Sequence, residues 1–494
     1  MYSKVKNFLQ NGENKKALFF YATLISAMLF FVLLQPLGEP PDEANHYLIV
    51  QYICLHGTIP HGADPEILIF GYGGSYAYQP ILTYIIQGYL LRFLFGFCKD
   101  GYLLLLAARL VNVVFGIIMA VYVRKTAKLL FRSASWQWLF SILIMFLPQS
   151  LFLHTYVNTD SMAMMSTAIM VYAWLNGYRT HWNRTSCLTL AAGISFCALS
   201  YYNAYGFILC SILFFIYTWF EKDSVSGKRQ LNWKGMLRYG LFISAVVLLC
   251  ISWWFIRNAV LYNGDFLGLA ARAKCTLETA TEQYHPLTKK TYYNTGYSLF
   301  YMIFRTDFLE LLTNSTIATF GPMSIVTFKH IYTVIKWLTV LSLAAVICIP
   351  KRLIQDVCPK CHKADSASAL CPAPPEEWDT ADRRALYVCM LSCIVITVSL
   401  CVGYSYLSDY QPQGRYILPM LVPFAYFMTL GMSRIAGLLQ AKLKIRAALL
   451  SRLPSFLTTL VALFYFYALW ITLIRVVFPV YYPTSILYYI RNLI

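Results

Sequence analysis

The chain has 494 residues, of which 59% are hydrophobic and only 13% are charged. A soluble domain has too little interior to bury so much apolar surface, whereas a lipid bilayer surrounds such a surface with hydrocarbon. The formal net charge is +18, but the basic residues gather in short segments between apolar runs. This distribution indicates membrane topology rather than nucleic-acid binding, and we expect an integral membrane protein.

Apolar runs that are candidates to cross a bilayer recur along the whole chain. They predict an all-α, polytopic transmembrane protein with about 11 spans. The predicted spans cover residues 17–37, 101–122, 138–153, 161–176, 186–201, 205–220, 238–262, 331–350, 384–404, 415–439 and 454–478. Residues 79–97 are also apolar, and we interpret them as a re-entrant or surface-lying helix, because a twelfth crossing would invert every later loop.

Basic residues set the expected orientation of these spans. Lys15 and Lys16 directly precede the first apolar run, which predicts a cytoplasmic N-terminus in an inner (plasma) membrane protein. Alternating sides from there places most of the 40 Lys and Arg residues on the inner side. It also places two long segments, 38–100 and 263–330, on the extracytoplasmic side, where loops of this length usually carry function.

The chain is expected to divide into two parts. Residues 1–330 form an N-terminal transmembrane module that carries both long outer segments. Residues 331–494 supply the C-terminal transmembrane helices and a polar, Pro-rich cytoplasmic insertion at 351–383. Cys358 and Cys361 in this insertion resemble half of a zinc knuckle, but a closed zinc site takes four ligands, so we expect free thiols rather than structural zinc.

The most informative motif, Pro41-Asp42-Glu43-Ala44-Asn45-His46, follows the first predicted span. Prolines and acids at this spacing favour the start of a helix. In such a helix Asp42 and His46 lie four residues apart on one face, and Glu43 lies nearby. A carboxylate beside an imidazole can transfer a proton or hold a metal ion. The alternative is a capped surface helix whose charges are solvated.

A lone acid, Asp160, ends the next predicted outer loop. It either stabilises the N-terminus of the helix that begins at Ser161 or acts together with Asp42, which we expect on the same side of the membrane. Asp42, His46 and Asp160 are therefore the candidate ligands for a divalent cation such as Mg²⁺, Mn²⁺ or Zn²⁺. Carboxylates and one histidine suit a metal-free site equally well.

Arginines recur near the expected outer boundary of the membrane, at Arg257, Arg305 and Arg415. The planar guanidinium group suits phosphate. The alternatives are arginines that snorkel to the interface or are solvated on the surface. Arg109 differs from these three because it lies about two turns inside a predicted span, where it needs an internal partner or water.

Together, these pieces resemble the GT-C superfamily of membrane glycosyltransferases. That superfamily has an acidic motif in its first outer loop and another acid in its second, which Asp42-Glu43 and Asp160 match in placement. Tyr78 to Tyr84 looks like a degraded form of the superfamily's His-Pro-Pro-Leu-Tyr-Tyr stretch. The chain is most similar to a bacterial GT-C-like family with Pro-Asp-Glu-x-x-His, here Pro41 to His46, and Gln-Gly-Arg-Tyr-x-x-Pro, here Gln413 to Pro419.

The resemblance implies a transferase that moves a sugar from a polyprenyl-phosphate donor to an extracytoplasmic acceptor of the cell envelope, either a glycan, a lipid or a protein. On this reading Asp42 is either the general base or the acid that orients the acceptor. Glu43, His46 and Asp160 would assist it, either by holding a divalent cation or by fixing the geometry. Arg257, Arg305 and Arg415 would hold the phosphate of the donor lipid. Two alternatives stay open at this point. One is a transporter or flippase of lipid-linked sugars, and the other is a non-enzymatic protein of envelope polysaccharide assembly.

Overall fold

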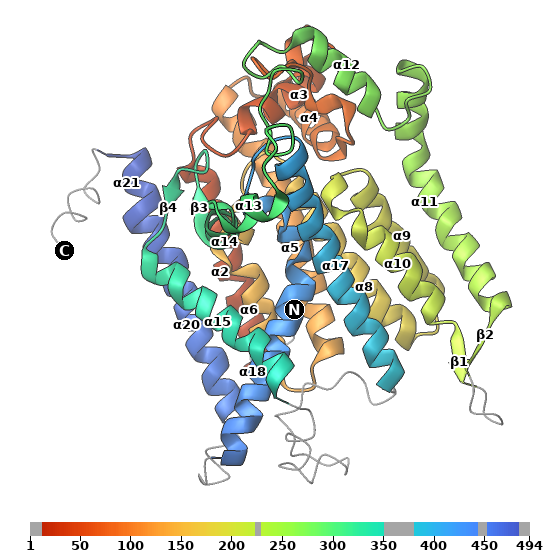
Figure 1. Ribbon diagram of the computed structural model, residues 1–494, viewed down its shortest axis with the longest axis vertical. Helices are drawn as coiled ribbons and strands as arrows, with labels where there is room; N and C mark the ends of the chain where they lie inside the picture. Colours follow the sequence, from red (N-terminus) through yellow and green to blue (C-terminus); the bar gives the residue numbers. More distant parts are fainter. Residues whose placement is uncertain (1–11, 223–228, 350–379, 443–451, 484–494) are drawn as a thin grey trace.

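The computed structural model of the protein describes residues 12–222, 229–349, 380–442 and 452–483. These residues form a bundle of helices, most of which run along the long axis of the molecule (Figure 1). Within the described residues, seven helices are long and apolar enough to cross a membrane. The prediction of an all-α integral membrane protein is thereby confirmed. Cys358 and Cys361 lie outside the described residues, as does nearly all of the predicted insertion 351–383.

Every predicted span contains a helix, although their lengths differ. The seven candidate membrane helices are built on α2 (Gly12–Leu34), α5 (Gly101–Leu130), α11 (Trp233–Leu261), α15 (Lys329–Cys348), α17 (Thr380–Leu407), α18 (Leu421–Lys442) and α20 (Leu453–Thr472). The other helices are α3 (Glu43–His56), α4 (Leu82–Phe95), α6 (Ala134–Met145), α7 (Pro148–Leu153), α8 (Asp160–Arg179), α9 (Arg184–Ala198), α10 (Gly206–Tyr217), α12 (Leu269–Thr279), α13 (Leu299–Phe304), α14 (Phe308–Ala318) and α21 (Phe478–Tyr481).

Short elements connect these helices. Single turns of 3₁₀-helix form at η1 (Pro65–Ile67), η2 (Tyr76–Tyr78), η3 (Tyr202–Ala204), η5 (Gly414–Tyr416) and η6 (Leu418–Met420), and a π turn at Leu473–Val477 joins α20 to α21. Two small antiparallel hairpins pair β1 (Phe220–Lys222) with β2 (Arg229–Leu231), and β3 (Thr319–Phe320) with β4 (Ile325–Val326).

Local sequence explains where several helices begin. The Asp100 side chain accepts a hydrogen bond from the Leu103 amide at 2.9 Å and so caps α5. The predicted span 138–153 is two helices rather than one, α6 and α7, because Pro148 stands inside it. Proline disfavours helical geometry at the residue before it, and Leu147 accordingly adopts an extended backbone (φ −61°, ψ 121°).

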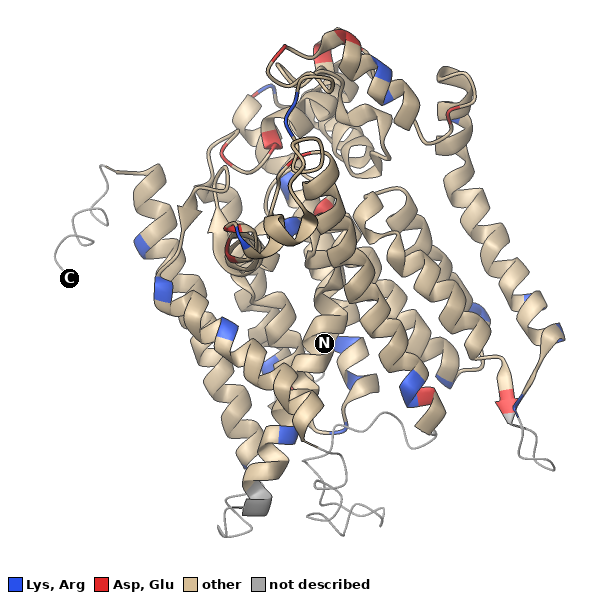
Figure 2. Cartoon of the chain, viewed as in Figure 1, with Lys and Arg blue, Asp and Glu red and all other residues tan. Residues whose placement is uncertain are grey.

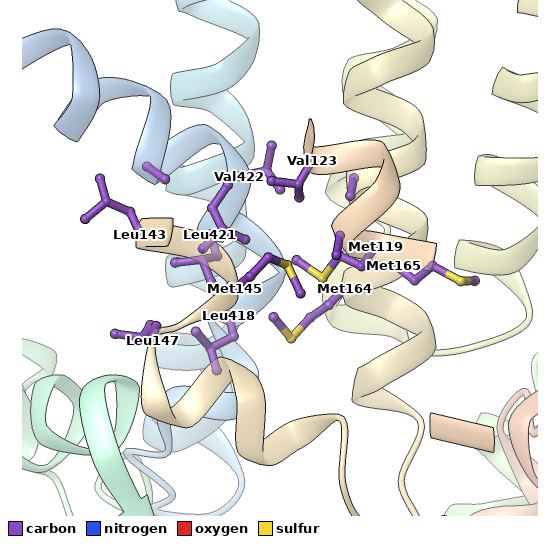
Figure 3. Close-up of a cluster of buried hydrophobic side chains, with 14 of the residues drawn as sticks. Met119, Val123, Leu143, Met145, Leu147, Met164, Met165, Leu418, Leu421 and Val422 are labelled. Atoms are coloured by element: carbon purple, nitrogen blue, oxygen red, sulfur yellow. The ribbon is translucent and has the colours of Figure 1, made fainter. Parts of the chain in front are cut away.

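The hydrophobic core joins the first and last parts of the chain. Figure 3 shows Met119 and Val123 of α5, Met145 of α6, and Met164 and Met165 of α8 packed against Leu418, Leu421 and Val422. Methionine is flexible enough to fill irregular gaps between helices that cross at different angles. Helix α8 is buried along most of its length, whereas α11 has few buried residues and stands at the edge of the bundle (Figure 1).

The first helices of the two long predicted outer segments gather at one end of the bundle, whereas α13 and α14 lie lower along its long axis (Figure 1). At that end α3 and α4 lie beside each other and α12 lies close to them (Figure 1), and many of the acidic residues are found there (Figure 2). Helix α4 has 14 residues, fewer than the roughly 20 that cross a bilayer. It packs closely on α3, since a Cβ atom at Gly88 would lie 2.5 Å from Ile53. That this end faces away from the cytoplasm is still a prediction from loop charge.

Candidate active site

A narrow cavity of about 40 Å³ lies where α3, η2 and η5 meet the N-terminus of α8. A cavity of this volume holds a few water molecules. It is lined by Asp42, His46, Tyr76, Gln79, Pro80, Ile81, Tyr84, Thr159, Asp160, Tyr201, Arg415 and Tyr416. The lining thus brings together the first predicted outer segment, the second outer loop and the late Gln-Gly-Arg-Tyr motif, which are far apart in the sequence.

Asp42 occupies the position before α3 and faces Arg415. Its φ of 59° lies in the left-handed region, which aspartate tolerates better than most residues, but at some cost in energy. The carboxylate does not cap its own helix; instead Oδ2 accepts a hydrogen bond from Nη2 of Arg415 at 2.5 Å. Burial raises the pKa of Asp42, but the charge and the hydrogen bond of Arg415 act in the opposite direction, and the pKa lies below its usual value. Asp42 is therefore ionised at neutral pH.

The glycine before Arg415 explains how this arginine reaches the cavity. A Cβ atom at Gly414 would lie 2.2 Å from the backbone nitrogen of Thr316, so only glycine lets η5 press against α14. The Gly414 amide donates to the Ser315 hydroxyl at 2.8 Å, which fixes the approach. Arg415 also donates to the Tyr416 hydroxyl at 3.0 Å. Its Nε atom is buried without a partner among the described residues.

Asp160 is the first residue of α8 and follows a fully braced loop. Asn112 of α5 donates to the carbonyl groups of Tyr156 and Asn158, and the Asn158 side chain accepts from the Ser161 amide at 2.9 Å. Burial raises the pKa of Asp160 to about 6, although Arg415 acts in the opposite direction. Its Oδ1 atom is buried and has no partner among the described residues. Since buried polar atoms are normally paired, this oxygen is available to accept a hydrogen bond from a group that enters the cavity.

His46 lines the same cavity as a neutral imidazole. Its Nδ1 atom lies 3.0 Å from the carbonyl oxygen of Val157, and because a carbonyl only accepts, the proton is on Nδ1 and a lone pair is on Nε2. The ring packs edge-on against Tyr76 and is stacked on Tyr84. Burial lowers the pKa of His46 to about 4, so it carries no charge at neutral pH.

Glu43, the other predicted acid of the motif, does not line the cavity. Its Oε2 atom accepts from Nη2 of Arg109 at 2.5 Å, and Oε1 accepts both from Nε of Arg109 at 2.8 Å and from the Val157 amide at 3.0 Å. Both side chains of this pair are 0% exposed. Arg109 further donates to the carbonyl groups of Val32 and Gln35 at the end of α2. Glu43 is thus the internal partner that Arg109 needs.

Two of the predicted phosphate ligands also lie away from the cavity lining. Nη2 of Arg257 donates to the carbonyl of Pro60 at 2.6 Å, and its guanidinium group lies over the Trp254 ring. Arg305 is exposed at the end of α13. Both residues are described, and neither is among those that line the cavity. Of the three arginines, only Arg415 is brought to Asp42 and Asp160.

Sequence reasoning missed an arginine that the structure places close to the cavity. Arg272 is half-buried on α12, which packs on η2, and it forms no ion pair with any described acid. A Cβ atom at Gly268 would lie 2.5 Å from the Tyr78 carbonyl, so glycine permits this packing. Burial raises the pKa of Tyr76, and the Arg415 and Arg272 charges both act against that rise. No sequence motif indicated Arg272, because only tertiary packing brings α12 close to the cavity.

The predicted metal ligands do not form a three-donor site. Within the described residues, no three His, Cys, Asp or Glu side chains are grouped closely enough to hold a metal ion. The Asp42 carboxylate is instead engaged by Arg415, which already supplies a positive charge between the acids. Asp42, His46 and Asp160 therefore do not fit a closed protein site for a divalent cation.

No protein-family model and no curated protein matches the chain. Among solved structures, it resembles the oligosaccharyltransferase AglB of Archaeoglobus fulgidus in complex with an inhibitory peptide and a dolichol-phosphate (TM-score 0.48, 14% identity, 93% of this chain and 56% of that chain). It also resembles the same archaeal enzyme in complex with zinc and sulfate (TM-score 0.49, 13% identity, 91% and 52%). A third is ArnT of Cupriavidus metallidurans bound to undecaprenyl phosphate (TM-score 0.37, 14% identity, 89% and 78%).

These likenesses are distant. The chain spans about half the length of the archaeal oligosaccharyltransferase chains. AglB and ArnT both belong to the GT-C superfamily that the sequence resembles. The three TM-scores are below 0.5, so these matches carry no argument about function.

Proposed function

We propose that this protein is a membrane glycosyltransferase that moves a sugar from a polyprenyl-phosphate donor to an acceptor. The observation that carries the proposal is the cavity in which Asp42, Arg415 and Asp160 converge at one end of the bundle. Two of its buried polar atoms, Arg415 Nε and Asp160 Oδ1, have no partner among the described residues. A donor for phosphate oxygens and an acceptor for hydroxyl groups are the complement of a sugar phosphate.

Binding of the donor would rearrange the Asp42–Arg415 pair. The cavity is too small for a sugar phosphate while Asp42 occupies the guanidinium group of Arg415. A phosphodiester anion competes with the carboxylate for the same N–H donors and takes them in a bidentate manner. Asp42 is then released from its counter-ion, which raises its basicity only when the donor is in place. Arg272, half-buried on α12, is a second candidate contact for the phosphate.

The chemistry follows from this arrangement. An acceptor hydroxyl attacks the anomeric carbon of the sugar as the bond from that carbon to the phosphate oxygen breaks. The hydroxyl proton passes to the Asp42 carboxylate, which acts as the general base. The polyprenyl phosphate leaves with the electron pair of the broken bond, and Arg415 stabilises its growing charge. No redox partner is needed.

His46 and Asp160 would position the acceptor. The Nε2 lone pair of His46 can accept a hydrogen bond from a sugar hydroxyl, since Nδ1 is held by Val157. Asp160 accepts another through its unpaired Oδ1. Glu43 acts indirectly, because it braces the turn that carries Asp42. We propose an acceptor of the cell envelope on the extracytoplasmic side, either a glycan, a lipid or a protein.

A transfer assay in proteoliposomes tests this function. A panel of radiolabelled polyprenyl-phosphate sugars is supplied with envelope acceptors to wild-type protein and to Asp42→Asn. We expect label to move to an acceptor with wild type, and the rate to fall about 10²- to 10⁴-fold in the variant, the usual contribution of a general base. Label that crosses the bilayer without transfer would favour a flippase. No dependence on any donor, with an equally folded protein, would favour a non-enzymatic assembly role.

A further inference from the structure

A second cavity, much larger than the first, lies beside the segment that carries Arg415. Its volume is about 410 Å³, and its wall is formed by α6, α14, α15, α18, α20 and η6. Leu147, Ile335, Leu418 and Phe424 are among its apolar lining residues. For comparison, an engineered apolar cavity of about 150 Å³ stays dry and binds benzene. A cavity of this size and composition suits a hydrocarbon chain.

One charged side chain, Lys336 of α15, interrupts this apolar lining. Two of the three lining threonines bond to their own helix, since Thr313 donates to the Leu309 carbonyl at 2.7 Å and Thr316 to the Leu312 carbonyl at 2.6 Å. The third, Thr339, donates to the Met428 sulfur at 3.9 Å. Lys336 forms no ion pair with any acidic side chain in the described part of the chain. It lies seven residues into a candidate membrane helix, where an ammonium group is costly without a partner.

The cavity opens toward the lipid side of the bundle between α14 and α15. Thr313 and Val340 both line it and are both exposed on the outside of the protein. Trp337 and Leu341, on the same outward face of α15, are 60% and 55% exposed. An apolar face on a membrane helix is covered by lipid, so a lipid chain can enter the cavity without crossing water.

The two cavities are separate. Their linings share no residue, and the short segment η5–η6 stands between them. Arg415 and Tyr416 face the small polar cavity, whereas Ile417 and Leu418 face the large apolar one. A lipid whose anionic head is held at Lys336 therefore does not present its phosphate to Asp42, so it is not the reacting donor.

We propose that this cavity binds an anionic phospholipid of the surrounding bilayer, with a fatty-acyl chain in the apolar cavity and its phosphate at Lys336. A zwitterionic phospholipid offers the same chain but no net charge to match the lysine. The bound lipid packs against the η5–η6 segment and stabilises it. The other side of this segment carries Arg415. This inference does not depend on the proposed transferase activity.

Thermal unfolding of the purified full-length chain in neutral detergent tests the proposal. Wild type is titrated with phosphatidylglycerol and, separately, with phosphatidylcholine of the same acyl composition. We expect phosphatidylglycerol to raise the unfolding midpoint at lower concentrations. In Lys336→Met that preference should weaken at least about tenfold, the cost of a lost charged hydrogen bond. Lys329→Met, on the same helix but outside the cavity lining, is the matched control and should keep the preference.

Two further variants separate the site from general lipid effects. Val340→Trp narrows the opening, and we expect it to abolish stabilisation by both phospholipids. Arg415→Ala changes only the other cavity and should retain the phosphatidylglycerol effect. Equal stabilisation of wild type by the two phospholipids would overturn the proposal, as would an unchanged preference in Lys336→Met. Stabilisation through Lys336 by polyprenyl phosphate but not by phosphatidylglycerol would assign the cavity to the donor lipid instead.

Discussion

Asp42 and Glu43 are adjacent in the sequence, and each forms an ion pair with a buried arginine at 2.5 Å, yet the two pairs differ in the exposure of the acid and in how many of their polar atoms are bonded. The Glu43–Arg109 pair is fully buried, and both Glu43 oxygens accept hydrogen bonds. In the Asp42–Arg415 pair, Asp42 is 32% exposed on its side chain and Arg415 keeps an unpaired Nε atom. The contact distance is therefore a poor guide to the role of an ion pair.

The difference teaches how one short motif can serve both structure and chemistry. Glu43 ties the start of α3 to Arg109 of α5 and to the loop before α8, and Arg109 in turn donates to the chain at the end of α2. The pair thus fixes the turn in which Asp42 takes its left-handed backbone. Asp42 is then free to face the cavity. The Glu43–Arg109 pair, in which both carboxylate oxygens are hydrogen-bonded, holds the start of α3 in place. The Asp42–Arg415 pair, in which Arg415 Nε is not hydrogen-bonded, keeps atoms available for a ligand.

The largest effect on stability should come from the buried pair. In Glu43→Gln, Arg109 is left as an uncompensated buried charge, which typically costs about 3–5 kcal/mol. We expect a strongly lowered unfolding midpoint in detergent. Asp42→Asn, the neighbouring isosteric control, should lower it less, because the Asp42 side chain is 32% exposed and water can reach its side of the pair. The double variant Glu43→Gln/Arg109→Met should recover much of the loss. If Glu43→Gln and Asp42→Asn have the same unfolding midpoint, the two ion pairs do not differ in their contribution to stability.

The Asp42–Arg415 pair should instead control donor affinity. Arg415→Lys keeps the charge but loses the planar fork that binds phosphate in a bidentate manner. We expect the apparent KM for the donor to rise about tenfold or more, as for one charged hydrogen bond, with little change in the unfolding midpoint. Arg257→Lys, an arginine outside the cavity lining, serves as the control. If Arg257→Lys loses more donor affinity than Arg415→Lys, the phosphate binds at Arg257, as the sequence predicted, and not mainly at Arg415.

A smaller effect should appear as a pH dependence that Asp160 controls. The pKa of Asp160 is raised to about 6, so its carboxyl group is neutral below that pH and becomes charged as the pH rises through it. The added negative charge beside Arg415 opposes an anionic donor, so affinity for a phosphodiester donor should fall as the pH rises through about 6. Asp42, with its lowered pKa, and His46, with a pKa of about 4, do not titrate in this window.

Asp160→Asn is the matched control for this pH profile. It removes the titrating group but retains the shape of the side chain, and the KM for the donor should become independent of pH between about 5 and 7. Because the pKa of Asp160 is higher in the folded protein than in the unfolded chain, the folded state holds this proton more tightly. The free energy of unfolding should therefore also decline as the pH rises through about 6. A pH profile that persists in Asp160→Asn would contradict the assignment.

The smallest effect is expected from removal of metal ions. Arg415, rather than a cation, engages Asp42, and no three donors are grouped among the described residues. Treatment with EDTA should therefore leave the transfer rate nearly unchanged, as judged against samples resupplied with Mg²⁺, Mn²⁺ or Zn²⁺. Loss of transfer that one of these ions restores would mean that the bound donor completes a metal site with Asp42 and Asp160.

The sequence predicted the helical membrane fold because hydropathy depends on composition alone. Its motifs also pointed to Asp42, His46, Asp160 and Arg415, which the structure places in one cavity. They did not separate Glu43 from Asp42, because the direction of each side chain is set by the left-handed turn at Asp42 and by Arg109. Arg272 was missed for the same reason, since its place above η2 depends on packing between segments nearly 200 residues apart.

The contrast between the two adjacent acids is tested most directly by the rate of sugar transfer per folded molecule in Asp42→Asn and Glu43→Gln, measured side by side. The folded fraction of each sample is determined by size-exclusion chromatography before the assay. We predict that Asp42→Asn folds normally and loses about 10²- to 10⁴-fold in rate, whereas Glu43→Gln loses mainly folded protein. A folded Glu43→Gln as inactive as Asp42→Asn, or an active Asp42→Asn, would contradict the division of roles.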